Sequence, residues 1–139
     1  EMCIRDRCNF PSERKGKALI AAAPNQFHVL GAHMVADLLM LDGWEVIYLG
    51  ANIPQQDLLE LIRKEKPFFV GLSAVLPFNL EYVHEIVATI RKTAEVQDVK
   101  IMVGGLAFSH GENLWKTVGA DAYAIDGVAC VQIAREWWE

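Results

Sequence analysis

One histidine of this sequence stands where a ligand-binding group is expected. His28 follows an apolar segment, Lys17–Ala23, and precedes a segment, Leu30–Leu41, whose apolar residues recur with the spacing of a helix. Open parallel sheets bind ligands at the carboxyl ends of their strands, so the imidazole falls at the edge where a ligand is expected. Gly31 follows three residues later, where the missing side chain allows close helix packing. An imidazole placed in this way is suited to hold a ligand.

Two other segments end in residues that suit a binding site. Ser73 ends one strongly apolar run, and Gly104 and Gly105 follow another. In a doubly wound sheet the carboxyl ends of the first, third and fourth strands meet at one edge. The sequence therefore predicts that these residues and His28 lie around a common site.

The segments that position these residues alternate between two kinds of periodicity. Predicted strands cover residues 17–23, 45–49, 68–73, 100–103 and 122–125, and predicted helices cover residues 30–41, 54–64, 80–93, 109–118 and 127–138. Regular alternation of strand and helix favours right-handed crossovers and parallel strands. We therefore expect an α/β fold, a flavodoxin-like (Rossmann-like) doubly wound sheet of five parallel strands in the order 2-1-3-4-5.

Length and composition indicate one domain, residues 16–139, after an irregular tail of residues 1–15. Hydrophobic residues make up 53% of the chain, yet no apolar run reaches the roughly 18 residues that a membrane span needs. The net charge is −5 and no stripe of Lys and Arg is present, which argues against direct contact with nucleic acid. We expect a cytoplasmic protein that contacts neither a membrane nor nucleic acid directly.

The cysteines do not indicate a disulfide framework. Their number is three, and an odd number of thiols favours a reducing compartment. Cys130 falls within a predicted helix, where we expect it to pack as a small hydrophobic residue. Cys3 and Cys8 lie in the irregular tail and receive no role.

Three common ligands of this fold class are disfavoured by the loop sequences. A dinucleotide site needs G-x-G-x-x-G after the first strand, where this chain has Ala23-Pro24-Asn25-Gln26. A flavin mononucleotide site would need a phosphate loop rich in Ser and Thr at the same place. A response regulator would need a phosphate-accepting Asp after the third strand, where this chain has Leu72-Ser73-Ala74.

Taken together, the three loops resemble the cobalamin (vitamin B12)-binding domain family over roughly residues 16–138. In that family the pattern Asp-x-His-x-x-Gly makes the His the lower axial ligand of cobalt, and the displaced dimethylbenzimidazole and its nucleotide tail enter a slot beside the sheet. His28 and Gly31 match this pattern. The family's Ser-x-Leu is similar to Ser73-Ala74-Val75, and its Gly-Gly pair to Gly104-Gly105.

The resemblance implies a cofactor, a metal ligand and a set of binding residues. The cofactor is adenosylcobalamin, methylcobalamin or hydroxocobalamin, and His28 is the ligand of its cobalt. The implied cofactor-binding residues are Gln26, Phe27, His28, Val29, Leu30, Gly31, Ser73, Val75, Leu76, Gly104, Gly105 and Phe108. The resemblance places the Ser73 hydroxyl near the buried base. A bulky residue at Gly104 or Gly105 is expected to block the tail while leaving the fold intact.

The chain departs from the family pattern at Gln26, where the family has an acidic residue. A carboxylate that accepts the imidazole N–H fixes the tautomer and makes the His a stronger metal ligand. A Gln carbonyl still accepts this hydrogen bond but carries no charge. We therefore expect a weaker bond between cobalt and His28 than in relatives with Asp.

The segment His28–Pro54 most resembles the light-sensing cobalamin-dependent transcription regulators and their stand-alone antirepressor relatives. The expected function is thus a binding module in the base-off, His-on form, a photoreceptor or cofactor sensor without enzyme activity of its own. It would regulate transcription through a protein partner or a missing helical cap domain. Trp137 and Trp138 near the end of the chain favour a homo-oligomer contact. Two alternatives remain, a corrinoid carrier domain of a methyltransferase or mutase, and a degenerate domain that binds no cofactor.

Overall fold

The computed structural model describes residues 15–22, 30–50, 53–74, 78–110 and 113–138. The strands are β1 (Lys17–Ala22), β2 (Glu45–Gly50), β3 (Phe69–Ser73), β4 (Lys100–Gly104) and β5 (Ala122–Ala124). The helices are α2 (Leu30–Leu41), α3 (Gln55–Glu65), α4 (Asn79–Lys92), α5 (Leu114–Thr117) and α6 (Gly127–Trp138), with a 3-10 helix, η1 (Leu106–His110). None of the helices in these ranges combines the length and apolar character needed to cross a membrane.

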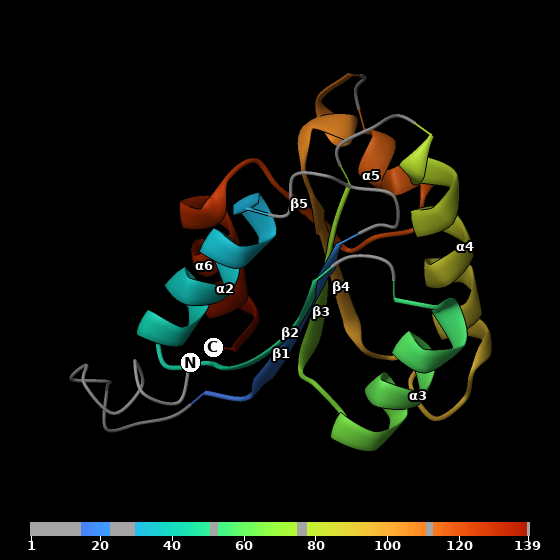
Figure 1. Cartoon of the computed structure of the whole chain (residues 1–139), viewed down its shortest axis with the longest axis horizontal. Helices are drawn as coiled ribbons and strands as arrows, with labels where there is room; N and C mark the ends of the chain where they lie inside the picture. The colour runs from blue at the N-terminus through green and yellow to red at the C-terminus, as the bar shows by residue number, and fades with distance from the viewer. Residues whose placement is uncertain (1–14, 23–29, 51–52, 75–77, 111–112, 139) are drawn as a thin grey trace.

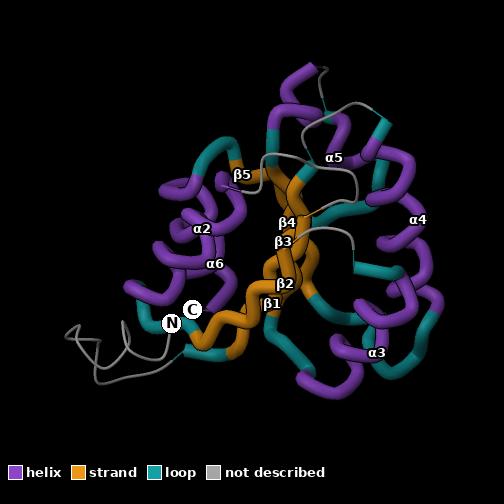
Figure 2. Tube along the Cα trace, in the orientation of Figure 1, coloured by secondary structure: helices purple, strands orange, loops and turns teal. Residues whose placement is uncertain are grey.

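The strands form one parallel sheet in the order β2-β1-β3-β4-β5, which confirms the order expected from the sequence. Helices α2 and α6 cover one face of the sheet, and α3, α4 and α5 cover the other (Figures 1 and 2). The carboxyl ends of all five strands therefore point to the same edge. Ser73 and Gly104, the last residues of β3 and β4, lie at this edge.

Local sequence signals explain where two of the helices end. Gly43 follows α2 with a φ of 100°, a backbone conformation that glycine adopts without strain. Lys66 follows α3 in the left-handed conformation, with a φ of 47°, and its N–H is donated to the carbonyl of Ile62. Both turns direct the chain into the next strand.

The predicted helix over residues 109–118 is wrong. The structure instead has the 3-10 helix Leu106–His110 and the four-residue helix Leu114–Thr117. Asn113, immediately before α5, has a φ of 60° and a ψ of 27°, which lies outside the helical range. A left-handed residue at this position prevents one continuous helix, although the apolar pattern of the segment favours it.

The two faces of the sheet are packed differently. Branched aliphatic side chains such as Leu19, Val70 and Ile101 fill the face toward α3 and α4. The face toward α2 and α6 contains many alanines and a group of aromatic rings. Trp44 packs edge-on against Phe69, with 5.1 Å between ring centroids. The second face therefore combines its bulkiest and its smallest residues.

Trp137 and Trp138 pack within the chain. The Trp138 ring lies 5.6 Å from that of Trp44 and 5.2 Å from that of Phe68. The Trp137 ring lies 5.9 Å from that of Phe69. Intramolecular packing thus accounts for much of the apolar surface of both rings, although Trp138 keeps 44% of its surface exposed.

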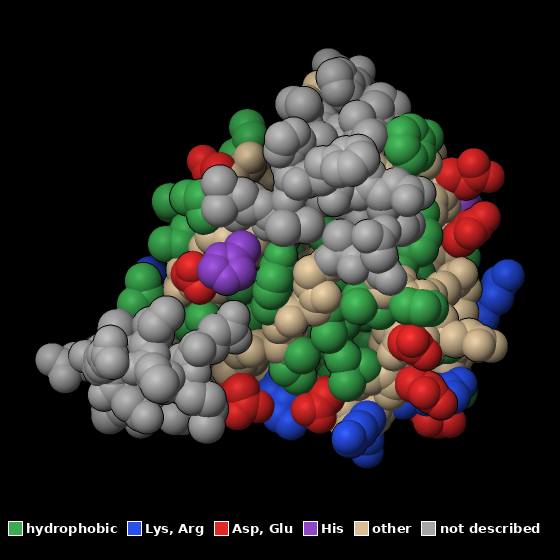
Figure 3. All heavy atoms as spheres, in the orientation of Figure 1, with side chains coloured by type: hydrophobic (Ala, Val, Ile, Leu, Met, Phe, Trp, Pro, Cys, Tyr) green, Lys and Arg blue, Asp and Glu red, His purple; other side chains and the backbone are tan. Residues whose placement is uncertain are grey.

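The two helical layers also differ on their outer surfaces. Charged side chains gather over α3 and its neighbours, and hydrophobic side chains reach the surface over α2 and α6 (Figure 3). Met34, Leu41 and Val128 belong to this second layer and are each more than half exposed. The layer formed by α2 and α6 is therefore apolar both against the sheet and on parts of its outer surface.

A buried carboxylate joins α2, α6 and the start of β1. The Asp42 side chain accepts hydrogen bonds from both Nε and Nη2 of Arg135. Lys15 donates from Nζ to the Asp42 backbone carbonyl at 2.6 Å and lies 3.5 Å from the carboxylate. Burial acts to raise the Asp42 pKa, but the Arg135 hydrogen bond and the charges of Lys15 and Arg135 outweigh it, so the pKa lies below its ordinary value.

We expect Asp42→Asn to lower the free energy of unfolding by about 1–3 kcal/mol at neutral pH, because it removes a charged acceptor from two hydrogen bonds. Glu45→Gln is the matched control, since the ion pair of Glu45 with Lys17 is long and exposed, and we expect it to cost less than about 1 kcal/mol. Denaturant unfolding followed by circular dichroism measures both.

The pH dependence of this effect has a defined sign. The folded-state pKa of Asp42 is lowered, so its contribution is fully present above the unfolded pKa of about 3.9 and is lost as the pH falls through the folded pKa. The difference between wild type and Asp42→Asn should be constant from about pH 5 upward and should shrink below about pH 4. A difference that grows on acidification would contradict this assignment.

Candidate functional site

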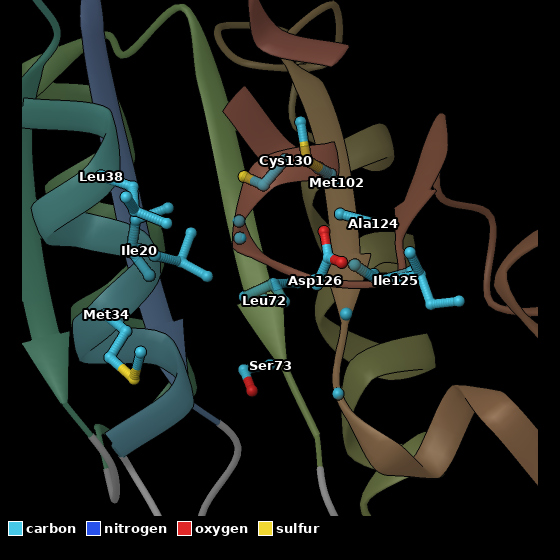
Figure 4. Close-up of a pocket in the computed structure, with 16 residues that line it drawn as sticks. Ile20, Met34, Leu38, Leu72, Ser73, Met102, Ala124, Ile125, Asp126 and Cys130 are labelled. Atoms are coloured by element: carbon cyan, nitrogen blue, oxygen red, sulfur yellow. The ribbon is translucent and has the colours of Figure 1, made fainter. Parts of the chain in front are cut away.

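A cleft of about 310 Å³ opens between the sheet and the helices α2 and α6. Its volume lies at the lower end of the range of about 300–1,000 Å³ that is common for small-molecule sites. Side chains from both helices and from the inner strands point into it (Figure 4). The apolar residues in its wall include Ile20, Met34, Val35, Leu38, Met102 and Cys130. The cleft is therefore an apolar cavity beside the sheet.

Small residues in one row across the sheet create the cleft. Ala22 pairs with Ser73, Ser73 pairs with Gly104, and Gly104 pairs with Ala124. Because paired residues of neighbouring strands share a face, all four lie toward α2 and α6. A Cβ built on Gly104 would meet only one heavy atom within 4 Å, the Ala124 carbonyl oxygen at 3.1 Å. The space beside Gly104 is the cleft itself.

Two further glycines bring the walls of the cleft together. A Cβ on Gly71, in the middle of β3, would lie 2.7 Å from Cδ1 of Ile20. A Cβ on Gly127, the first residue of α6, would lie 2.5 Å from Cδ1 of Leu38. A side chain at either position would push a lining residue into the cavity. Gly71 and Gly127 therefore let the walls of the cleft approach each other while no side chain is pushed into its interior.

Gly105 also lines the cleft, but its backbone conformation and its close approach to Ala74 require a glycine. Its φ is 106°, and a Cβ there would lie 2.2 Å from the carbonyl oxygen of Ala74. The same Ala74 oxygen accepts a hydrogen bond from the N–H of Ala107, the second residue of η1. The expectation that a bulky residue at Gly105 would leave the fold intact is therefore wrong. For Gly104 it stays a prediction, because a Cβ there would meet one heavy atom, the Ala124 carbonyl oxygen at 3.1 Å.

Polar groups are sparse among the described residues that line the cleft. Ser73 lies half-buried at the end of β3, and Asp126 is exposed just before α6. Asp126 Oδ1 accepts a hydrogen bond of 2.8 Å from the N–H of Ala129, as the cap of α6. Burial raises the pKa of the Cys130 thiol to about 12, so this group is neutral at physiological pH. The chemistry of the cleft is that of a binding site.

The structure brings together part of the predicted site. Ser73, Gly104 and Gly105 line the cleft. Leu30 and Gly31 form the first turn of α2. Phe108 is buried on the opposite face of the sheet, with its ring 6.2 Å from that of Tyr123, and does not line the cleft.

The remaining predicted residues lie outside the described part of the chain. These are Gln26, Phe27, His28, Val29, Val75 and Leu76. The described ends of the first segment are Ala22, which pairs with Ser73, and Leu30 at the start of α2. Among the described residues no group of three or more His, Cys, Asp or Glu side chains is placed to hold a metal ion. His28 thus remains the predicted metal ligand.

Sequence reasoning missed several residues of the cleft. Gly71 carried a usable signal, because a glycine inside an apolar strand often marks a close approach of a ligand or another backbone. Gly127, at the start of a predicted helix, carried a weaker one. Met34, Met102 and Cys130 carried none, because their spacing is that of ordinary core residues. The prediction that Cys130 packs as a small hydrophobic residue is confirmed, since it is 3% exposed.

Comparisons with known proteins identify the ligand class. Residues 16–132 match the model of the family described as B12 binding domain. A dimethylamine corrinoid protein of Methanosarcina mazei is 25% identical over 126 residues, which cover 90% of this chain and 57% of that protein. The chain therefore spans a little over half the length of this relative.

Two solved structures share the fold. A cobalamin-binding protein from Desulfitobacterium hafniense aligns with a TM-score of 0.82 and 27% identity, over 88% of this chain and 59% of that one. The methanol:cobalamin methyltransferase complex of Methanosarcina barkeri contains a chain that aligns with a TM-score of 0.73 and 20% identity, over 96% of this chain and 50% of that one. This second likeness shows the fold alone.

The two adjacent glycines provide a matched test of the site geometry. We expect Gly105→Ala to lower the free energy of unfolding by at least about 2 kcal/mol, because its Cβ meets a carbonyl oxygen and its φ is positive. Gly104→Ala should change it by less than about 1 kcal/mol. Denaturant unfolding of the two variants compares them directly. Equal stability of Gly105→Ala and wild type would show that the turn after β4 is built differently.

Proposed function

The chain belongs to the B12-binding domain family, and from that premise we propose that it is the corrinoid-carrying domain of a methyl-transfer system. In this role the domain holds cobalamin, and a partner protein supplies the substrate chemistry. Bound cobalamin would supply a cobalt ion able to carry a methyl group between a donor and an acceptor. The observation that carries the proposal is the glycine-lined apolar cleft beside the ends of β3 and β4.

The relatives favour this function over the sensor expected from the sequence. The matched protein of Methanosarcina mazei is named a dimethylamine corrinoid protein. One solved structure with the same fold is that of a methyltransferase complex. None of the three relatives described above is named as a light sensor or a transcription regulator. The corrinoid carrier, kept as an alternative at the level of sequence, is therefore the better supported function.

The residues present fit the cofactor at two places. Beside Gly104 lies an apolar space in which a flat aromatic base can be enclosed, and Gly71 lets Ile20 pack closely in its wall. Ser73 lies at the carboxyl edge of this space, where its hydroxyl can donate a hydrogen bond to a ring nitrogen of the base. Such a cleft explains how the domain would hold the base away from cobalt.

In the proposed arrangement His28 would be the residue that holds the cobalt. In the sequence it falls between Ala22, the last residue of β1, and Leu30, the first residue of α2, and Ala22 pairs with Ser73. Gln26, two residues earlier, would accept the other imidazole N–H and orient the ring. This assignment rests on the family pattern of the sequence.

The cleft has the chemistry of a carrier site. Among its described lining residues, Asp126 is the charged one, and its carboxylate already accepts the N–H of Ala129. A general acid or base must reach the reacting group with a free proton or lone pair. In this proposal, the groups that activate the methyl donor and acceptor therefore belong to the partner.

Replacement of His28 tests the site. We expect His28→Ala to weaken the binding of hydroxocobalamin at least tenfold and to remove the absorption change produced by imidazole coordination. His33→Ala is the matched control, since this second histidine, also on the segment after β1, lies beside Asp37 and Tyr48. Absorption spectra and calorimetric titration in the dark measure both variants. A His28→Ala spectrum identical to wild type would remove His28 as the ligand.

Light separates the carrier from the sensor. A carrier loaded with methylcobalamin should keep the same oligomeric state before and after green light, even though the cofactor loses its methyl group. Size-exclusion chromatography with light scattering measures this. A change of oligomeric state that occurs only after illumination would support the sensor and contradict the carrier.

Gln26 is expected to limit the strength of the cobalt–imidazole bond. Gln26→Asp supplies the family's carboxylate, and we expect it to tighten hydroxocobalamin binding by about tenfold, the lower bound for such supporting groups. Gln56→Asp, which introduces the same charge at an exposed position of α3, is the control. Equal affinities for wild type and Gln26→Asp would show that residue 26 does not support the ligand.

A further inference from the structure

The deep end of the cleft is uniformly apolar. Figure 4 shows Leu38, Met102 and Cys130 at one end, Ser73 and Met34 at the other, and Asp126, which is exposed and accepts the N–H of Ala129, between them. Ser73 is the last residue of β3, so the polar end is the one at the carboxyl edge of the sheet. Ile20 and Met102 are 3% and 2% exposed. A ligand that reaches the deep end therefore meets only aliphatic carbon and sulfur.

The backbone offers no polar group there either. Gly71, in β3, pairs with Ile20 of β1 on one side and with Met102 of β4 on the other. The amide and carbonyl groups of β3 at this level are thus used in the parallel ladder. The Cys130 thiol, neutral and 3% exposed, is at most a weak donor.

We infer that the cleft selects the lower base of the corrinoid, accepting an apolar benzimidazole and rejecting a purine. The inference rests on the proposed function, in which the base occupies the cleft. A dimethylbenzimidazole released from cobalt has one ring nitrogen in need of a hydrogen bond, which Ser73 at the polar end can satisfy. Its methyl groups suit the deep end.

An adenine base has a different requirement. Its further ring nitrogens are acceptors and its exocyclic amine carries two donor hydrogens, and the deep end offers partners for none of them. Polar groups buried without partners oppose binding. Apolar pockets discriminate against a single added polar group by up to about a hundredfold. We therefore expect adeninylcobamide to bind about tenfold to a hundredfold more weakly than cobalamin.

Three corrinoids with the same upper ligand test this in the wild-type chain, by calorimetric titration in the dark. They are cobalamin, adeninylcobamide, and cobinamide, which lacks the base. The expected order of affinity is cobalamin first, with adeninylcobamide close to cobinamide. Equal affinities for cobalamin and adeninylcobamide, both above cobinamide, would overturn the selectivity and leave the proposed function standing. Equal affinities for all three would show that the base does not enter the cleft, and both proposals would fail.

A pair of variants at Cys130 tests whether the apolar deep end of the cleft causes the preference for cobalamin over adeninylcobamide. Cys130→Ser places a hydroxyl at the deep end in almost the same volume, and Cys130→Ala removes the thiol without adding a polar group. We expect the preference for cobalamin over adeninylcobamide to fall about fivefold in Cys130→Ser, the effect of one hydrogen bond, and to stay within twofold of wild type in Cys130→Ala.

The preference is the ratio of the affinities for cobalamin and adeninylcobamide. Comparing this ratio between each variant and wild type cancels the different tendencies of the two bases to bind cobalt in free solution. Thermal unfolding by circular dichroism confirms that each variant is folded. The wild-type comparison decides the matter alone if Cys130→Ser does not fold. An unchanged preference in folded Cys130→Ser would overturn the assignment of the selecting wall to the deep end.

Discussion

The cleft depends on an uneven distribution of side-chain volume over one face of the sheet. At the amino end of that face, rings such as Trp44, Phe69 and Trp137 fill the space beneath α2 and α6. At the carboxyl end, Ser73 and Gly104 stand at paired positions and are too small to reach the helices. Protein interiors are normally close-packed. Helices held away from the sheet by aromatic rings at one end leave a cavity at the other.

The relative position of α2 and α6 is held by contacts of two kinds. Gly127 lets the start of α6 approach Leu38 on α2. Farther along both helices, Arg135 donates two hydrogen bonds to the buried carboxylate of Asp42. Removing a partner from a buried ion pair costs much more than the pair itself contributes. The pair therefore disfavours arrangements in which the helices slide and close the cavity.

The sequence predicts the framework of this fold well and the details of the site less well. Periodicity predicts the parallel sheet, because strands buried on both faces read as continuous apolar runs. It does not show that Asn113 adopts a left-handed conformation, which divides a predicted helix in two. It also does not show which glycine serves which purpose. Gly104 leaves space for a ligand, whereas Gly105 next to it is needed for a backbone hydrogen bond at Ala74.

The division of labour within the proposed site follows from where its polar groups lie. An apolar cleft holds a flat ring through the hydrophobic effect and close packing, which are not directional. The cleft therefore adds affinity without affecting the reactivity of a distant metal. Control of the metal then falls to the imidazole of His28 and to whatever accepts its second N–H. In the proposed site that acceptor would be the neutral Gln26. A carrier must release its group to a partner as readily as it accepts it, and a moderately basic ligand suits that requirement.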